Sequence, residues 1–188
     1  MAFSAHHNND EELIRKAAEQ FRQGDALAFQ YLYKYFSRGI YRFCLKMLGE
    51  EAAAKDAYQE TFLRVYEHRA EFRGENFPAW LYTIARRVCL NVIRSRKGNE
   101  EFDELFHSNE ECTESDVFLR KHIQRALDSL PDMLKEAIVL REFEGLSYQE
   151  IAEVLHIDLS LAKVRVHRAR LIVRKILTPI IQERYEPR

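Results

Sequence analysis

The stretch Gly145–Ile176 constrains the fold most, because it predicts two helices joined by a tight turn. Ser147 and Glu150 have the spacing of a capping box, which starts the first helix. The turn is His156–Asp158, and Ser160 can cap the second helix. In that helix, apolar residues at spacings of four, three and four predict a stripe that packs inward: Ala162, Val166, Ala169 and Val173.

The second of these helices is basic on its other faces. Between Leu159 and Lys175 there are six Lys or Arg and no Asp or Glu. Such a helix-turn-helix is suited to the major groove of DNA, where Arg and Lys can reach guanine edges and phosphates. The candidates for contact with duplex DNA are Ser160, Lys163, Arg165, His167, Arg168 and Arg170. The alternative is a solvated helix hairpin whose basic residues only keep one face wet.

Composition places the chain among ordinary globular proteins. It has 188 residues, of which 46% are hydrophobic and 31% charged, so one domain or two small ones are expected. Alternating Val, Ile and Thr are scarce, so strands are not expected and the predicted fold is all-α. The net charge of −1 does not by itself indicate any class of binding partner. The basic and acidic residues are, however, segregated into blocks.

Several classes of protein are disfavoured. The N-terminal residues do not read as a signal peptide, and no apolar window is long enough to span a membrane, so we expect no membrane insertion. Cys44, Cys89 and Cys112 are far apart and form no C-x-x-C pair, which predicts reduced thiols in a cytoplasmic protein. No phosphate loop, nucleophile constellation or metal-ligand spacing is present, so we expect neither an enzyme nor a cofactor.

Helices are also predicted through the first half of the chain. The first spans Asp10–Gln23, with Leu13 on its inward face, and the second runs from Asp25 to about Gly49. Glu50–Phe72 forms a third, with Tyr66 among its inward residues and an outward polar face that carries Asp56, Gln59, Glu60 and Arg64. Two carboxylates at i, i+4 could be an acid–base pair or a metal site, but no His accompanies them. A surface for a partner, or plain solvation, is favoured.

A second basic helix, Ala79–Arg96, follows a loop that ends at Pro78. With Lys97 it carries five Lys or Arg and no acid, interleaved with aromatic residues. That combination suits single-stranded nucleic acid, where rings stack on bases and cations hold the backbone. The candidates are Phe77, Trp80, Tyr82, Arg86, Arg87, Asn91 and Arg94. The alternative is a core Trp beside a solvated basic face.

An acidic segment divides the chain. Residues 98–116 hold eight Asp or Glu and no Lys or Arg, which is typical of an extended linker. The predicted organisation is a helical domain over 1–97, a flexible linker over 98–116 and a second helical domain over 117–188. In the second domain, a helix over Val117–Leu130 and one after Pro131 precede the helix-turn-helix, and Thr178–Arg188 is a short tail.

This order of elements resembles the extracytoplasmic-function (ECF, group IV) sigma factors of bacterial RNA polymerase, from about Asp10 to Leu177. DAYQETFLRVY (Asp56–Tyr66) is similar to sigma region 2.2, and Phe72–Arg96 to regions 2.3 and 2.4. Leu127–Arg170 is similar to region 4. The combination is specific, whereas the helix-turn-helix alone is weak evidence.

The resemblance implies a non-enzymatic promoter-specificity subunit of RNA polymerase. Asp56, Gln59, Glu60 and Arg64 would bind the clamp helices of the core β′ subunit, and the second domain would bind the β flap. The Phe72–Pro78 loop and the following helix would capture the melted −10 strand, with a base flipped into a pocket. The helix-turn-helix would read the −35 element as duplex. An anti-sigma factor is the implied regulator.

The chain departs from the family pattern at three places. Before the recognition helix the family often has Gly-x-Pro-x-Gly-Thr-Val, where this chain has His156–Ala162. Val164 replaces a usual small polar residue, and Arg87 stands where Asn is common. The fold and general role are expected to survive these changes, but the promoter sequence does not follow from them.

The residues leave two alternative functions. A stand-alone helix-turn-helix regulator with a sensing or dimerising N-terminal half would explain Gly145–Ile176, but not the basic aromatic helix at Ala79–Arg96. Copurification with the polymerase β and β′ subunits distinguishes the two. An enzyme is disfavoured by the missing motifs.

Overall fold

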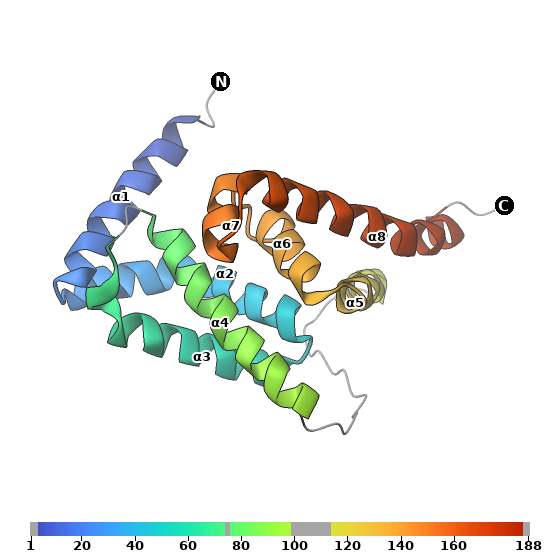
Figure 1. Cartoon of the computed structure of the whole chain (residues 1–188), viewed down its shortest axis with the longest axis horizontal. Coiled ribbons are helices and arrows are strands. Elements are labelled where there is room, and N and C mark those ends of the chain that lie inside the picture. The colour runs from blue at the N-terminus through green and yellow to red at the C-terminus, as the bar shows by residue number, and fades with distance from the viewer. Residues whose placement is uncertain (1–3, 74–75, 99–113, 186–188) are drawn as a thin grey trace.

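The computed structural model describes the backbone of residues 4–73, 76–98 and 114–185, and the side chains of 10–73, 76–96 and 117–182. Over these residues the chain is helical and has no strand (Figure 1), which confirms the predicted fold class. The elements are α1 (Ser4–Arg22), α2 (Ala26–Leu48), α3 (Glu51–Glu67), the 3₁₀ turn η1 (Arg69–Glu71), α4 (Phe77–Gly98), α5 (Glu114–Asp128), α6 (Asp132–Glu142), α7 (Tyr148–Leu155) and α8 (Leu159–Tyr185). The predicted linker, 98–116, lies outside the described residues except at its ends.

The helix ends follow local chemistry. The Asp25 carboxylate accepts hydrogen bonds from the backbone N–H groups of Leu27 and Ala28, at 2.8 and 3.3 Å, and so caps α2. The Ser147–Glu150 capping box at α7 is confirmed, with both of its hydrogen bonds formed. These signals need only neighbouring residues, which is why the sequence predicts them well.

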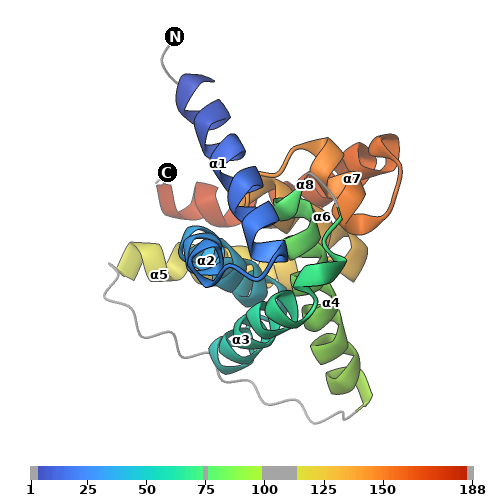
Figure 2. The same cartoon turned by 90° about the vertical axis from the view of Figure 1, so that its left-hand side faces the viewer.

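The N-terminal half, α1 to α4, packs its aromatic side chains into one core. Phe21, Phe43 and Phe77 are at most 1% exposed. Burying each such ring contributes about 1.5–3 kcal/mol, so they dominate the packing. The N-terminal end of α1 projects beyond the other helices (Figure 2). The predicted inward positions of Leu13 and Tyr66 are wrong: they are 45% and 44% exposed, and Ile14 takes the buried place on α1.

The thiols Cys44 and Cys89 lie in this core, and both are free and buried. The pKa of Cys44 is raised well above its usual value by a hydrogen bond with the neighbouring Cys89 thiol and by burial. A thiol in such surroundings stays protonated and unreactive. Cys112 lies outside the described residues.

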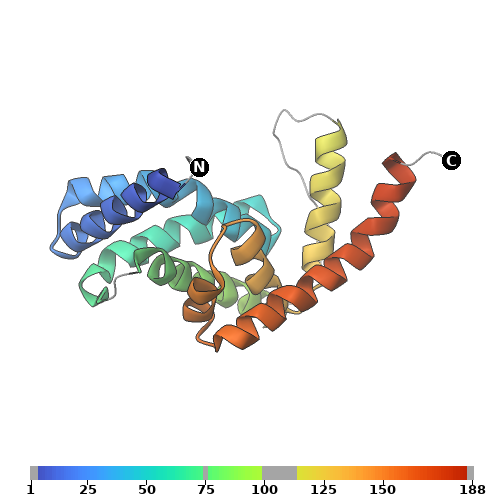
Figure 3. The ribbon, with the colours of Figure 1, turned by 90° about the horizontal axis from the view of Figure 1, so that it is seen from above.

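The C-terminal half is built on α8, against which α5, α6 and α7 pack. Figure 3 shows α5 and the far end of α8 leaving the molecule on the same side. The predicted inward stripe is confirmed for Ala162, Val166 and Ala169, which are fully buried, whereas Val173 is half-buried. The predicted tail after Thr178 is wrong, because α8 continues through Pro179 to Tyr185. An exposed position makes this proline tolerable, since water can bond the carbonyl that it leaves free.

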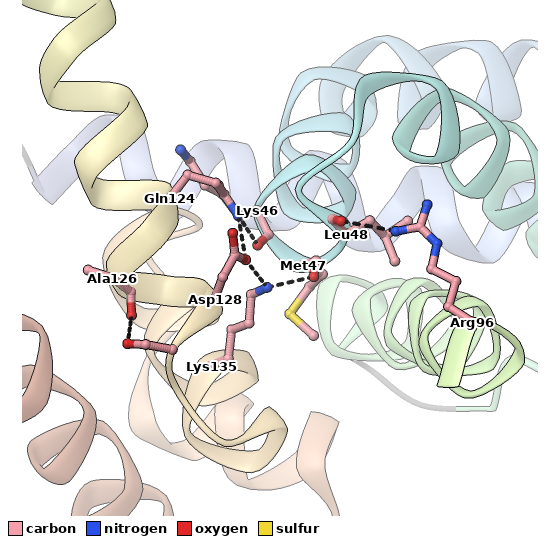
Figure 4. Close-up of polar contacts among 9 residues, drawn as sticks. Lys46, Met47, Leu48, Arg96, Gln124, Ala126, Asp128 and Lys135 are labelled. Atoms are coloured by element: carbon pink, nitrogen blue, oxygen red, sulfur yellow. Dashed lines mark hydrogen bonds and ion pairs between the residues drawn. The ribbon is translucent and has the colours of Figure 1, made fainter. Parts of the chain in front are cut away.

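The two halves pack together, with α4 against α7 and α2 against both α5 and α6. The last carbonyls of α2 lie at this contact (Figure 4). Gln124 Nε2 donates to Lys46 O at 3.1 Å, Lys135 Nζ to Met47 O at 2.8 Å, and Arg96 Nη1 to Leu48 O at 3.3 Å. Helix C-termini leave these carbonyls unpaired and favour cations, so both α4 and the C-terminal half complete the end of α2.

Candidate nucleic-acid interface

The basic outer face of α8 is largely open to solvent. Ser160, Lys163, His167 and Arg168 are exposed, opposite the buried Ala162, Val166 and Ala169. Ser160 lies within the first turn of the helix, since α8 already begins at Leu159. The arrangement presents one row of polar and cationic side chains at helical spacing, as contact with a DNA groove requires.

The other two candidates on α8 are held by side chains of this chain. The Arg165 side chain is 17% exposed and lies 3.8 Å from the Glu136 carboxylate on α6. Arg170 Nε donates to Glu142 Oε1 at 2.8 Å, and Nη1 to the Tyr148 hydroxyl at 3.4 Å. Arg165 Nε is buried and has no hydrogen-bond partner among the described residues. The sequence did not reveal these acidic neighbours.

The turn that sets the direction of α8 contains one strained residue. His156 has φ 52° and ψ 51°, in the left-handed region, and its N–H caps the end of α7 by donating to Ala152 O and Glu153 O. Glycine adopts this conformation without steric cost, whereas a side chain does not. The departure from the family pattern at this position therefore leaves the turn formed but strained.

On α4, part of the predicted basic face is exposed. Arg87, Asn91 and Arg94 point to solvent. Trp80 is half-buried, and its ring lies 5.3 Å from that of Phe72 and 5.7 Å from that of Phe77. Exposed cationic side chains of α4 therefore share this helix with a cluster of aromatic rings.

Two aromatic candidates on α4 are not on its outer face. Phe77 is the first residue of the helix and is 1% exposed, in contact with Phe21 and Phe36. Tyr82 is 4% exposed, and its hydroxyl donates to Glu144 at 2.8 Å. Burial raises the pKa of Tyr82 far above its ordinary value, and the Glu144 carboxylate raises it further. A place for Tyr82 on the polar face of α4, as nucleic-acid contact needs, is therefore wrong: its ring lies 5.6 Å from that of Phe43 on α2, and Glu144 of the C-terminal half binds its hydroxyl.

Arg86 is also engaged across the two halves. Its Nε donates to Glu136 Oε2 at 2.7 Å and its Nη2 to Glu136 Oε1 at 3.1 Å. The Arg86 side chain is 20% exposed and that of Glu136 is 3% exposed. A paired, two-point contact of this kind is strong and directional. Arg86 and Arg165, one from each basic helix, thus lie against the same carboxylate.

A groove runs between α4 and the end of α7. Phe72, Trp80 and Arg87 line one side, and Glu153 and His156 line the other. Asn76 Nδ2 donates to Glu153 Oε2 across it, at 2.9 Å. The sequence did not predict that residues of α7 would line this groove, because the contact joins residues 77 positions apart.

The polar face of α3 is exposed as predicted. Asp56 and Gln59 are solvent-exposed, and Arg64 pairs with Glu60 one turn earlier. Among the described side chains, no group of three or more His, Cys, Asp or Glu converges as a metal site. No helix in the described part of the chain is long and apolar enough to cross a membrane.

Two family models match the chain. Residues 32–98 match sigma-70 region 2, and residues 120–172 match sigma-70 region 4. These segments contain the basic helices α4 and the first half of α8, respectively.

Two relatives match this chain over most of its length and almost all of their own. The chain is 33% identical over 183 residues to the ECF RNA polymerase sigma factor SigW of Bacillus subtilis, covering 89% of this chain and 98% of that protein. It is 31% identical over 189 residues to the RNA polymerase sigma-H factor of Pseudomonas aeruginosa, covering 92% and 98%.

The fold is similar to that of CnrH in complex with the cytosolic domain of CnrY, with a TM-score of 0.73 and 22% identity over 89% of this chain and 98% of that one. It is also similar to that of the sigma factor RpoE of Bartonella quintana in complex with the anti-sigma factor NepR, with a TM-score of 0.68 and 23% identity over 80% and 96%. Because both family models match in order and relatives above 30% identity are covered almost end to end, this chain belongs to the ECF family of RNA polymerase sigma factors, which are non-enzymatic transcription initiation factors.

Proposed function

We propose that this sigma factor binds core RNA polymerase and reads a promoter at two places, a single-stranded −10 element with α4 and a duplex −35 element with α8. The observation that carries the proposal is the pair of cationic helix faces. Arg87, Asn91 and Arg94 are exposed on α4, and Lys163, His167 and Arg168 on α8. Arg86 and Tyr82, which Glu136 and Glu144 of the C-terminal half engage, join the −10 set once that half moves away. Arg165 joins the −35 set by leaving Glu136, which belongs to its own half.

The outward face of α3 is the proposed surface for the β′ clamp helices. Asp56, Gln59, Glu60 and Arg64 lie on one side of the helix, away from the core residues Ala57, Thr61 and Val65. Surface charges of this kind act through steering and specificity more than through raw affinity. The C-terminal half is the proposed site for the β flap. We place the functional boundaries at 1–97, 98–116 and 117–188.

Regulation by an anti-sigma factor is part of the proposal. The fold of this chain is similar to that of the B. quintana sigma factor bound to an anti-sigma factor. Such a partner would act in the cytoplasm, where the polymerase lies, by covering the polymerase-binding or DNA-binding faces.

The test is transcription in vitro with purified core polymerase, followed by mapping of start sites. We expect specific initiation only when both core and this chain are present. Tight binding of the free chain to a promoter duplex, combined with no transcription in the presence of core, would instead support a stand-alone regulator.

Paired variants separate the two surfaces. Asp56→Ala combined with Glu60→Ala should weaken core binding in a pull-down while leaving the DNA-reading helices intact. The matched control is Glu51→Ala with Lys55→Ala, an exposed ion pair one turn earlier on the same helix. An unchanged pull-down for the first pair would remove this face of α3 from the proposal.

A further inference from the structure

The clearest unexplained feature of the molecule is a buried carboxylate in the link between α6 and α7. The Glu144 side chain is 1% exposed. It accepts hydrogen bonds from Arg42 Nε and Nη2, both at 2.9 Å, and from the Tyr82 hydroxyl at 2.8 Å. Arg42 lies on α2 and Tyr82 on α4, so one side chain of the C-terminal half holds two helices of the N-terminal half.

A glycine makes room for this carboxylate. Gly39 lies within α2, where glycine is a poor helix former. A Cβ at this position would lie 2.7 Å from the Tyr82 hydroxyl oxygen and 3.0 Å from Glu144 Oε2. The first distance is shorter than carbon–oxygen contact allows and the second is unusually tight, and Tyr82, 4% exposed, is too closely packed to move easily. We call Gly39, Arg42 and Tyr82 the Glu144 notch.

A second buried carboxylate lies farther along the same contact. Glu136 is held by Arg86 of α4 and has Arg165 of α8 at 3.8 Å. Two arginines on the two DNA-reading helices therefore neutralise one acid that is itself inaccessible. DNA phosphates and bases would need the same guanidinium groups, so DNA binding and this contact exclude one another at Arg86.

We propose that the Glu144 notch and the Glu136 site form a latch that holds the sigma factor closed, and that the free protein withholds Arg86 and the Tyr82 hydroxyl from promoter DNA until the two halves separate. The role assigned to the DNA rests on the proposed function above; the closure itself does not.

The chemistry of the contact suits a reversible latch. When a buried ion pair separates, hydration of the two charges offsets much of the attraction that is lost. Such a pair therefore holds a defined arrangement without the large net stabilisation of an apolar interface.

The experiment uses the full chain and a substitution that removes no polar group. Gly39→Ala adds one methyl group inside the notch. Ser37→Ala, two residues earlier, is the matched control, because its hydroxyl donates to Lys34 O within the same helix, at 3.3 Å. Spin labels are placed on Lys34→Cys and Arg174→Cys, at exposed positions on α2 and α8, in a Cys112→Ser background. Distances between the labels report closure without any DNA or polymerase.

We expect a short, narrow distance distribution for the parent and for Ser37→Ala, and a longer, broader one for Gly39→Ala. Glu144→Gln should shift the distribution in the same direction, and it replaces Gly39→Ala if the added methyl group prevents folding, as judged by circular dichroism. The affinity of the free chain for a fork-junction DNA taken from a mapped start site should rise about fivefold, if the open fraction rises from about 10% to about 50%.

Each possible result either supports the proposal or overturns part of it. Unchanged distances in folded Gly39→Ala and Glu144→Gln would overturn the latch. Longer distances without tighter DNA binding would overturn its inhibitory role. If the parent chain directs no transcription with core polymerase, the proposed function fails, while the label distances still decide whether the notch holds the halves together.

Discussion

The basic helices α4 and α8 carry similar charge, yet they differ in what covers them. On α8 the cationic face is mostly open, and among the described side chains Arg165 and Arg170 are the two basic residues of this helix that pair with acids. On α4 the C-terminal half binds the Tyr82 hydroxyl and the Arg86 guanidinium, leaving Arg87, Asn91 and Arg94 exposed. A basic helix is therefore not a DNA-binding surface by charge alone, because the same residues can close an intramolecular contact.

The largest expected effect concerns the inner face of α8. Val166→Asp places a charge at a fully buried position and should destabilise the fold by more than about 4 kcal/mol, because the carboxylate would have no partner. Urea denaturation followed by circular dichroism measures this. Val164→Asp, at a position 41% exposed on the same helix, should change stability by less than about 0.5 kcal/mol. Equal losses would mean that the two faces of α8 are wrongly assigned.

Arg168 tests the open face of α8. Arg168→Ala should weaken holoenzyme binding to a −35 duplex by about 1–3 kcal/mol if the side chain contacts a base, because a good base contact contributes that much. Filter binding at fixed salt measures it, and core binding should stay intact. The control is Arg174→Ala, also exposed but farther along the helix. A parallel loss of core affinity would indicate a folding defect rather than a lost contact.

Arg86 and Arg94 test the covered and open parts of α4. Arg86→Ala leaves Glu136 with only the more distant Arg165, so the free energy of unfolding should fall by about 1–2 kcal/mol, the loss being limited once water reaches the acid. Arg94→Ala, at an exposed position, should stay within about 0.5 kcal/mol of the parent. Thermal unfolding of the free chain compares them. If Arg94→Ala proved the more destabilising, the contrast drawn within α4 would be wrong.

The smallest effect is expected at the turn before α8. His156→Gly should stabilise the chain by about 0.5–1 kcal/mol, since glycine adopts the left-handed conformation without the steric cost that a side chain carries. His156→Ala keeps that cost and should not stabilise, which separates a backbone effect from loss of the imidazole. Denaturation midpoints of the two variants measure the difference. A destabilised glycine variant would show that the imidazole contributes more than the strain removes.

The parts of the molecule that the sequence predicts well are those governed by near neighbours. The Asp25 cap, the Ser147–Glu150 box and the inward stripe of α8 depend on spacings of a few residues. The errors arise where the 3.6-residue period leaves two faces of similar character, as for Leu13 and Ile14 on α1. The prediction of a tail after Thr178 is also wrong, because α8 continues through Pro179, which lies at an exposed position where water can bond the carbonyl left free.

The candidate sites were predicted less evenly. The α3 face and the open part of α8 are where the pattern places them. The cover over Tyr82 and Arg86 was not predictable, because Glu144 and Glu136 lie 62 and 50 residues farther along the chain. Glu136 also occurs among apolar residues of α6, and nothing in its spacing distinguishes a buried acid from a solvated one.

The sequence by itself determined that the chain is helical, that it carries two cationic helices in a fixed order, and that it resembles the ECF sigma family. Helix propensity, capping and charge segregation are properties of short segments, and they survive without tertiary context. Only the tertiary structure decided which cations remain available, because burial and pairing depend on side chains brought together from distant parts of the chain. Gly39 illustrates the difference. Within its own helix it only lowers helix propensity, whereas the tertiary structure shows that a side chain there would crowd Tyr82 and Glu144.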